Sequence, residues 1–191
     1  MARSVTEKGD LVSPLLELFC DHGIDGVSVA MVSQKTGLGK GSIYYFFPSG
    51  KPDMVEFVLN NAERNLSEKM FVLTDHKMKG KRGIEEFLNF FVSDKVFLTY
   101  IHFLSVLVLS KQRIVYLQKI NLFYEDMTSK LARAIAKEGY SPSKAWNIAE
   151  NVTVSIYGSY LFSCSLSNKS YFTNRIKKLN KIVSENLKTK L

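Results

Sequence analysis

Hydrophobic residues recur at helical spacing along the whole chain, and no segment alternates between apolar and polar positions as a strand would. No fixed repeat and no low-complexity linker interrupts this pattern. The first apolar stripe ends at Gly23 and consists of Leu11, Leu15, Leu16 and Phe19. The pattern therefore predicts an all-α protein.

Helix-end signals divide the first 50 residues into three short helices. Pro14 either kinks the first helix or occupies its first position with Ser13 as the N-cap, and the sequence leaves both readings open. Ser28 is suited to cap a second helix that runs through Thr36, because its hydroxyl can accept a bond from a first-turn N–H group. Gly37 then ends that helix.

A third short helix is predicted over residues 39–46, and Pro48, Ser49 and Gly50 predict a turn after it. Longer helices follow. Pro52 suits the start of a helix that runs to about residue 72, and the polar stretch 75–83 predicts a loop. Ser141 followed by Pro142 is a strong start signal. The remaining helices are expected at about 84–94, 99–110, 112–138, 142–167 and 171–188.

The stretch GLGKGSIYYFF, residues 37–47, predicts a helix with two different faces. A helix turns by about 100° per residue, so Ile43 and Phe47 share one side and can anchor the segment to the first two helices. Gly41, Tyr44 and Tyr45 lie toward the opposite side. A short helix held from behind in this way is typical of the second helix of a helix-turn-helix, which enters the major groove of DNA.

The exposed side of this helix carries groups that suit DNA. Gly41 allows a base or a phosphate to approach the backbone, and the hydroxyls of Tyr44 and Tyr45 can donate to phosphate oxygens. Lys40 and Ser42 lie at the leading end, from which side chains can reach base edges or backbone.

The net charge of +8 invites a nucleic-acid interpretation, but its distribution matters. Residues 1–51 contain five basic and five acidic side chains, whereas residues 169–191 contain seven basic side chains and only Glu185 as an acid. A solvated helix face is the simplest meaning of this C-terminal charge, and attraction to DNA or to an acidic membrane is the alternative.

Several classes of protein do not fit. The apolar run 97–110 is too short to span a membrane and contains His102, and residues 1–10 lack the apolar core of a signal peptide. Cys20 and Cys164 lie in helical patterns, so we expect free thiols and therefore a cytoplasmic protein. Because neither a spanning segment nor a signal peptide is predicted, we also expect no contact with membranes.

Candidate chemistry outside the 37–47 stretch is sparse. His22, His76 and His102 lie far apart without metal-ligand spacing, and GKGS at 39–42 lacks the upstream glycine of a phosphate-binding loop. SPSK at 141–144 is explained by a helix cap. We therefore expect no metal, no cofactor and no enzymatic activity.

A family resemblance adds to this reading. The segment GVSVAMVSQKTGLGKGSIYYFFPSGKPDM at 26–54 resembles the DNA-binding signature of the TetR family of bacterial repressors. That signature has a hydroxyl residue opening the second helix, then Gly-x-x-Lys-Gly-Ser/Thr-hydrophobic-Tyr, an aromatic pair, and Pro-Ser followed by a lysine. The turn FPSGK at 47–51 is similar to the Phe-Pro-x-Gly-Lys turn of drug-resistance-type repressors, and YLFSCSLSNKSYF at 160–172 resembles the junction of the last two helices in that subgroup.

The resemblance implies a helix-turn-helix DNA-binding domain over residues 1–50 and a helical regulatory and dimerisation domain over residues 51–191. It implies a homodimer formed by the last two helices, whose small residues would allow close approach, with packing inside one chain as the alternative reading. It also implies a small-molecule site between the middle helices, for which His102, Tyr116 and Tyr157 are the candidate polar contacts. The implied DNA contacts are Ser28, Lys40, Gly41, Ser42, Tyr44, Tyr45 and Lys51.

The sequence thus predicts a ligand-responsive transcriptional repressor that binds a palindromic operator in double-stranded DNA and is released by a small hydrophobic or aromatic effector. One alternative is a helical small-molecule-binding protein or enzyme whose N-terminal helices are only structural. A second alternative is a membrane-surface protein that uses the basic C-terminal helix.

Overall fold

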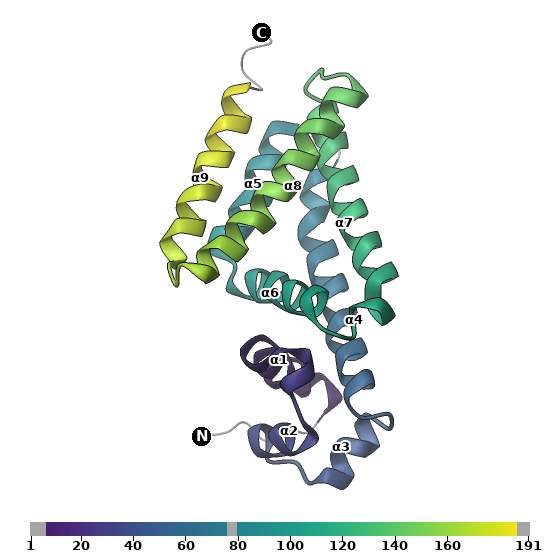
Figure 1. The fold of residues 1–191 in the computed structure, drawn as a ribbon. Coiled ribbons are helices and arrows are strands. Elements are labelled where there is room, and N and C mark those ends of the chain that lie inside the picture. Colours follow the sequence, from purple (N-terminus) through teal and green to yellow (C-terminus); the bar gives the residue numbers. More distant parts are fainter. Residues whose placement is uncertain (1–6, 76–79, 187–191) are drawn as a thin grey trace. The chain divides into compact units, whose positions relative to one another are not determined.

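The computed structural model describes residues 7–75 and 80–186, and every regular element in these ranges is a helix. The predicted all-α class is confirmed. In chain order the elements are η1 (Lys8–Leu11), α1 (Val12–Gly26), α2 (Val29–Thr36), α3 (Lys40–Phe46), α4 (Lys51–Met70), η2 (Phe71–Leu73), α5 (Gly80–Ser93), α6 (Lys95–Leu109), α7 (Arg113–Ala136), α8 (Pro142–Ser165) and α9 (Lys169–Asn186), as labelled in Figure 1.

The chain forms two compact units that are not consecutive in sequence. Unit 1 contains Met1–Asn65 and Thr99–Ile120, and unit 2 contains Leu66–Leu98 and Asn121–Leu191. Helices α4, α6 and α7 each contribute residues to both units. These two packing units differ from the predicted functional domains, which divide the chain between residues 50 and 51. That functional division stays a prediction.

The first helix corrects both readings of Pro14, because its N-cap is Leu11 and not Ser13. Helix α1 begins at Val12 directly after η1, so Pro14 lies in its first turn, where a missing N–H group costs no helical hydrogen bond. The chain does not kink there. The break lies at Gly23, whose φ of 72° and ψ of 161° are not helical. Positive φ is accessible to glycine without steric cost, which explains why the break falls at this residue.

The core of unit 1 joins α1 to α6. The rings of Phe19 and Phe103 pack with centroids 5.9 Å apart, and both side chains are fully buried. Cys20 is close by, with its sulfur 3.8 Å from the carbonyl oxygen of Thr99. Burial, followed by the charges of Asp21 and Glu17, raises the pKa of the Cys20 thiol to about 12.

Two glycines allow close packing in unit 2. A Cβ on Gly80 would lie 2.2 Å from the carbonyl oxygen of Ala134, and one on Gly83 would lie 2.5 Å from that of Val72. Glu138 accepts a hydrogen bond of 2.7 Å from the backbone N–H of Lys81 and so satisfies a donor at the start of α5. The predicted loop at 75–83 is therefore wrong for residues 80–83, which are helical, while residues 76–79 lie outside the described residues.

Helix α8 starts at the predicted Pro142, whereas α9 starts at Lys169, two residues before its predicted start. Ser141 accepts a bond of 3.4 Å from the N–H of Lys144, with Pro142 in the first helical position of α8. Asn168 performs the same role for α9, with its side-chain oxygen 3.1 Å from the N–H of Ser170. The rings of Tyr160 and Phe172 then pack edge to face across the two helices, 5.5 Å apart.

The small residues of α8 correct an expectation. We expected them at the dimer interface, but their side chains are buried within the single chain. The structure therefore supports the alternative reading for them, which is packing inside one chain. The buried members are Ala145, Ala149, Val152, Ile156 and Ser159.

No single helix among the described residues has the length and apolar composition to cross a membrane, although α5 and α6 pass that test together as a bent pair. The same residues hold no group of three or more His, Cys, Asp and Glu side chains that could bind a metal ion, and His76 lies outside them. Residues 1–6, on which most of the signal-peptide expectation rests, also lie outside the description.

Candidate nucleic-acid interface

Helix α2 begins and ends at the predicted residues. The hydroxyl of Ser28 accepts a bond of 3.3 Å from the N–H of Met31, which caps the helix. Gly37 ends it in the left-handed region, with φ at 75° and its N–H bonded to the carbonyl of Ser33 at 2.9 Å. Ser28 is exposed while it performs this capping role, so its hydroxyl lies at the surface.

Two hydroxyl residues fix the turn between α2 and α3. Ser33 donates to the carbonyl oxygen of Leu38 at 2.6 Å. Thr36 donates to the carbonyl of Val32 at 2.7 Å and accepts from the N–H of Leu38 at 3.3 Å. The sequence prediction did not assign roles to Ser33 and Thr36. The signal was present, because a hydroxyl just before a helix-ending glycine commonly bonds nearby backbone groups.

Helix α3 has the two faces that its sequence predicts. Ile43 and Phe47 are fully buried. The ring of Phe47 packs on that of Phe57 at 5.5 Å, and the ammonium of Lys8 lies 4.9 Å from the centre of the Phe47 ring. These contacts anchor α3 from behind.

The opposite face of α3 is open to solvent. Tyr45 is 81% exposed and Tyr44 is 49% exposed, and Lys40, Gly41 and Ser42 are exposed as well. The two phenols are not equivalent. The Tyr44 ring lies over the turn, 3.7 Å from the place where a Cβ on Gly50 would stand, whereas Tyr45 touches its neighbour Phe46 with ring centres 5.5 Å apart.

The basic groups of this region are differently engaged. Lys35 forms an ion pair of 2.7 Å with Glu17, which partly offsets its charge. Lys40 has no acidic partner within residues 7–75 and 80–186. The ammonium of Lys51, at the start of α4, donates to the backbone oxygen of Asp25 at 2.9 Å. The positive charge of Lys40 is therefore not offset by an acidic side chain, and the ammonium of Lys51 is held in position by its bond to Asp25.

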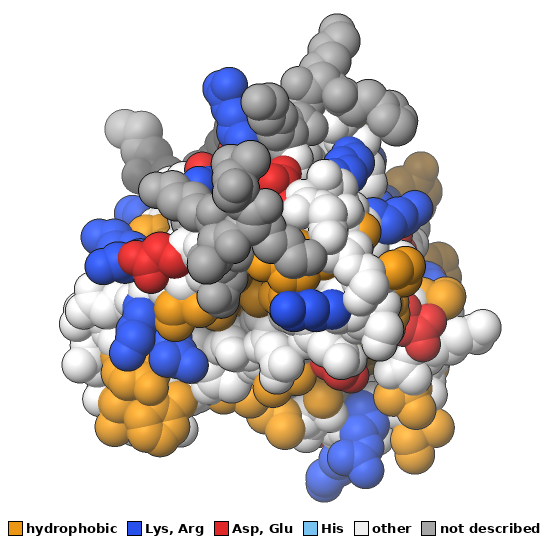
Figure 2. Space-filling view, turned by 90° about the horizontal axis from the view of Figure 1, so that it is seen from above, with side chains coloured by type: hydrophobic (Ala, Val, Ile, Leu, Met, Phe, Trp, Pro, Cys, Tyr) orange, Lys and Arg blue, Asp and Glu red, His pale blue; other side chains and the backbone are white. Residues whose placement is uncertain are grey.

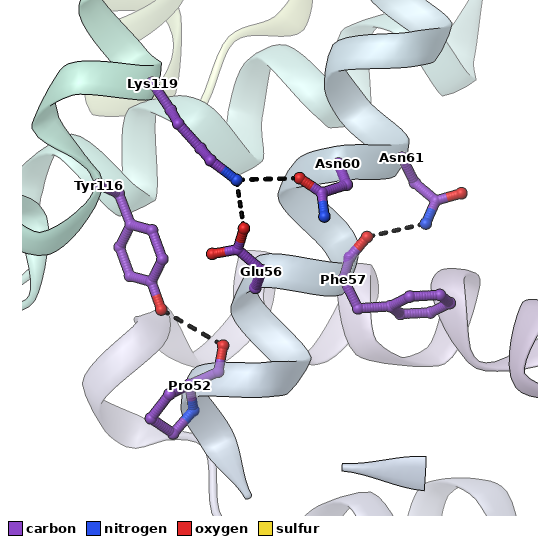
Figure 3. A network of polar contacts seen from close by, with 7 residues as sticks. All are labelled: Pro52, Glu56, Phe57, Asn60, Asn61, Tyr116 and Lys119. Atoms are coloured by element: carbon purple, nitrogen blue, oxygen red, sulfur yellow. Dashed lines mark hydrogen bonds and ion pairs between the residues drawn. The ribbon is translucent and has the colours of Figure 1, made fainter. Parts of the chain in front are cut away.

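The start of α4 is joined to the start of α7 by a polar network (Figure 3). The hydroxyl of Tyr116 donates to the carbonyl oxygen of Pro52 at 3.3 Å. The ammonium of Lys119 forms an ion pair with Glu56 and donates to the side-chain oxygen of Asn60 at 3.1 Å. All of these residues belong to unit 1. The beginning of α7 is therefore part of the body that carries α3.

The three residues predicted to contact a small molecule fall in different surroundings. His102 and Tyr116 lie in unit 1, and Tyr157 lies in unit 2. Burial lowers the pKa of His102, partly opposed by the charge of Asp21, which favours the neutral imidazole. Burial also raises the pKa of Tyr116, with the charges of Glu56 and Asp53 adding to it.

The hydroxyl of Tyr157 is buried and lacks a hydrogen-bond partner within the described part of the chain. The ring of Tyr124 stands edge-on to that of Tyr157, with centroids 4.7 Å apart. Burial, then the influence of Tyr124, raises the pKa of Tyr157 well above its usual value. The two phenols interact, but their geometry does not meet that of a hydrogen bond.

The N-terminal part of the chain matches a known sequence family. Residues 13–56 match the family model for bacterial regulatory proteins of the tetR family. The matched segment contains α2, α3 and the first turn of α4, and therefore includes all seven predicted DNA contacts. No curated protein matches the chain significantly in sequence.

Solved structures extend the likeness to nearly the whole chain. A TetR transcriptional regulator from Legionella pneumophila has a TM-score of 0.77 at 12% identity, covering 94% of this chain and 99% of its own. The fold is that of TetR-type regulators. A transcriptional regulator from Rhodococcus sp. Rha1 has a TM-score of 0.71 at 15% identity, covering 95% and 97% of the two chains. A TerR/AcrR-family transcriptional regulator from Aquifex aeolicus VF5 has a TM-score of 0.63 at 20% identity, covering 96% and 99%.

Proposed function

We propose that this chain is a ligand-responsive transcriptional repressor that binds a palindromic operator as a homodimer. The observation that carries the proposal is the two-sided construction of α3, with Ile43 and Phe47 sealed inside and both tyrosines of the opposite face in solvent. The match of residues 13–56 and the TetR-type fold support it. In this proposal the protein is a drug-resistance-type repressor, and the likeness of its turn FPSGK at residues 47–51 to the turn of that subgroup is the support.

The predicted residues take distinct roles on the duplex. Lys40, Gly41 and Ser42 lead α3 into the major groove and set sequence preference, because side chains at the start of a recognition helix reach base edges. Tyr44, Tyr45, Ser28 and Lys51 contact phosphate and fix the position of the domain. The charge-neutral N-terminal segment keeps non-specific affinity low, because each neutralised phosphate adds salt-dependent binding.

The homodimer forms through the outer faces of α8 and α9. These faces expose a set of large apolar side chains that water solvates poorly, and exposed apolar patches commonly mark protein interfaces. The set comprises Val154, Leu161, Phe162, Leu166, Tyr171 and Ile182. Two α3 helices related by the dimer axis would then meet half-sites about 34–36 Å apart, or a multiple of that distance.

The effector is a small hydrophobic or aromatic molecule, for which His102, Tyr116 and Tyr157 supply polar contacts. The Tyr116 hydroxyl already donates its proton to Pro52, so it can only accept from a ligand. The buried Tyr157 hydroxyl can still donate. Release from DNA requires the effector to bind the DNA-incompetent arrangement more tightly than the competent one.

In this proposal the basic side chains of the C-terminal helix form a solvated helix face and bind neither DNA nor a membrane. Figure 2 shows blue Lys and Arg side chains scattered between hydrophobic ones over the face seen there, with fewer acidic side chains in red. Lys177 and Lys178 of α9 are exposed, whereas Lys188 and Lys190 lie outside the described residues. Sedimentation with anionic lipid vesicles would reveal a membrane role instead.

A gel-shift assay on the DNA upstream of the chain's own coding sequence tests the proposal. Wild-type protein should retard a specific fragment, and Lys40→Gln should weaken binding and reduce the slope of log affinity against log salt by about 1. Lys178→Gln, on α9, is the matched control because it lowers the net charge by the same one unit at an exposed place with no proposed DNA contact. A wild-type chain that retards no duplex would favour the small-molecule-binding protein or enzyme.

A further inference from the structure

Asp25 contacts two parts of unit 1 that are far apart in sequence. It lies in the short segment of α1 that follows the break at Gly23. Its side-chain oxygen Oδ2 accepts a hydrogen bond of 3.0 Å from the backbone N–H of Lys111, in the turn between α6 and α7. Its backbone oxygen accepts the bond of 2.9 Å from the ammonium of Lys51. One residue thus connects the start of α4 with the turn before α7.

The Lys51 bond satisfies a carbonyl oxygen that the end of α1 leaves without a partner, and the Asp25 carboxylate satisfies the N–H of Lys111 in the turn just before α7. The N–H groups at the beginning of a helix and the C=O groups at its end have no acceptor or donor within the helix. The carboxylate of Asp25 supplies a charged acceptor just before α7, and Lys51 supplies a cation at the end of α1. Each placement also suits the helix dipole, which favours anions at the start of a helix and cations at its end.

The turn that Asp25 holds is itself fixed. Tyr116 and Lys119, in the first two turns of α7, are bonded to Pro52 and Glu56 of α4. The Lys111 amide is therefore a rigid point of attachment, and the carboxylate of Asp25 ties the end of α1 to it. The break at Gly23 makes this attachment important, because an interrupted helix does not hold its last residues by its own hydrogen bonds.

We propose that Asp25 is a positioning residue for DNA binding. Its side chain anchors the end of α1 on the Lys111 amide, and its backbone oxygen then holds the ammonium of Lys51 at the place from which it contacts phosphate. A lysine ammonium has three donors, so two remain for phosphate oxygens while one stays on Asp25. Ordering this long side chain before DNA arrives avoids part of the entropy cost of binding. The inference rests on the proposed function.

Charge and position make opposite predictions for this residue. Removing an acidic side chain makes the protein more positive, which by itself strengthens binding to DNA. Loss of the anchor frees the end of α1 and Lys51, which weakens binding. The sign of the change therefore separates the two effects.

The experiment measures binding of full-length protein to a fluorescein-labelled duplex that the wild-type chain recovers from a random duplex pool. Asp25→Ala should bind about tenfold more weakly despite its gain in charge, as expected for a lost charge-assisted hydrogen bond. Asp25→Asn retains an acceptor oxygen and should bind within about threefold of wild type. Asp21→Asn, also exposed on α1, makes the same charge change and should bind at least as tightly as wild type.

Two further readouts separate a positioning role from a general loss of structure. The amide of Lys111 should exchange its hydrogen faster in Asp25→Ala than in Asp25→Asn. In a Lys51→Met background, Asp25→Ala should cause little additional loss of affinity, because the group that it positions is already gone.

The inference is overturned if Asp25→Ala binds as tightly as Asp21→Asn, or if its loss is undiminished in the Lys51→Met background. If Asp25→Ala does not fold, Asp25→Asn becomes the test. Asp25→Asn must then keep its affinity for the duplex while the Lys111 amide remains protected from hydrogen exchange. A wild-type chain that recovers no duplex from the pool would overturn the proposed function, and the positioning role with it.

Discussion

Tyr116 on α7 donates its hydroxyl proton to the carbonyl oxygen of Pro52 in the first turn of α4, across 3.3 Å and 64 positions of sequence. Tyr116→Phe removes this bond and leaves the ring in place. We expect a loss of about 1 kcal/mol in the free energy of unfolding, the usual net contribution of one hydrogen bond. Urea denaturation measures it. Tyr45→Phe is the matched control, because its hydroxyl is in solvent, and an equal loss in both variants would contradict the role of the Pro52 contact.

The glycines of unit 1 and unit 2 should respond to alanine in opposite ways. Gly83→Ala forces a methyl group to within 2.5 Å of the Val72 carbonyl oxygen, so we expect a destabilisation of about 1–3 kcal/mol. Gly41→Ala has open space around the new methyl group and should stabilise α3 by about 0.5–1 kcal/mol. Thermal unfolding compares the two. The same Gly41 variant should bind DNA less tightly, because the methyl group keeps the duplex away from the backbone.

The two thiols should differ in reactivity. Cys20 is largely buried with its pKa raised to about 12, so almost none of it is thiolate at neutral pH. Cys164 is exposed on α8. A chromogenic disulfide reagent should modify one thiol quickly and the second only after unfolding. Cys164→Ser should abolish the fast phase, and a remaining fast phase would contradict the packing of Cys20.

Alkaline pH should destabilise unit 2 through its buried phenols. Burial raises the pKa of Tyr124 to about 12, although the interaction with Tyr157 lowers it slightly. Because the folded state disfavours the ionised phenol, the stability is fully present below the unfolded pKa of about 10 and is lost as the pH rises toward 12. The loss should be on the order of 1–2 kcal/mol. Chemical denaturation at pH 9 and pH 11.5 measures it, and the same fall in Tyr124→Phe would show that other groups cause it.

Local signals predicted much of the N-terminal structure. The cap at Ser28, the end at Gly37 and the two faces of α3 follow from residue type and helical spacing alone, so they could be read from a few neighbouring positions. The start of α8 at Pro142 was predictable for the same reason.

Contacts between distant segments were not predictable. The bond between Asp25 and the Lys111 amide joins positions 86 residues apart, and an exposed aspartate near a helix end gives no sign of its partner. The helical start at Gly80 depends on the approach of the Ala134 carbonyl and on Glu138, which no local pattern contains. The small residues of α8 suggested an interface, but spacing does not tell which neighbour a small residue packs against.

The composition of unit 1 bears on the engineering of hybrid regulators. Phe19 of α1 packs on Phe103 of α6, so the hydrophobic core of unit 1 is completed by a segment that begins more than thirty residues after α4 leaves the unit. A DNA-reading head transplanted as residues 1–65 alone would leave that ring uncovered. Hybrids should therefore carry residues 99–120 from the same parent.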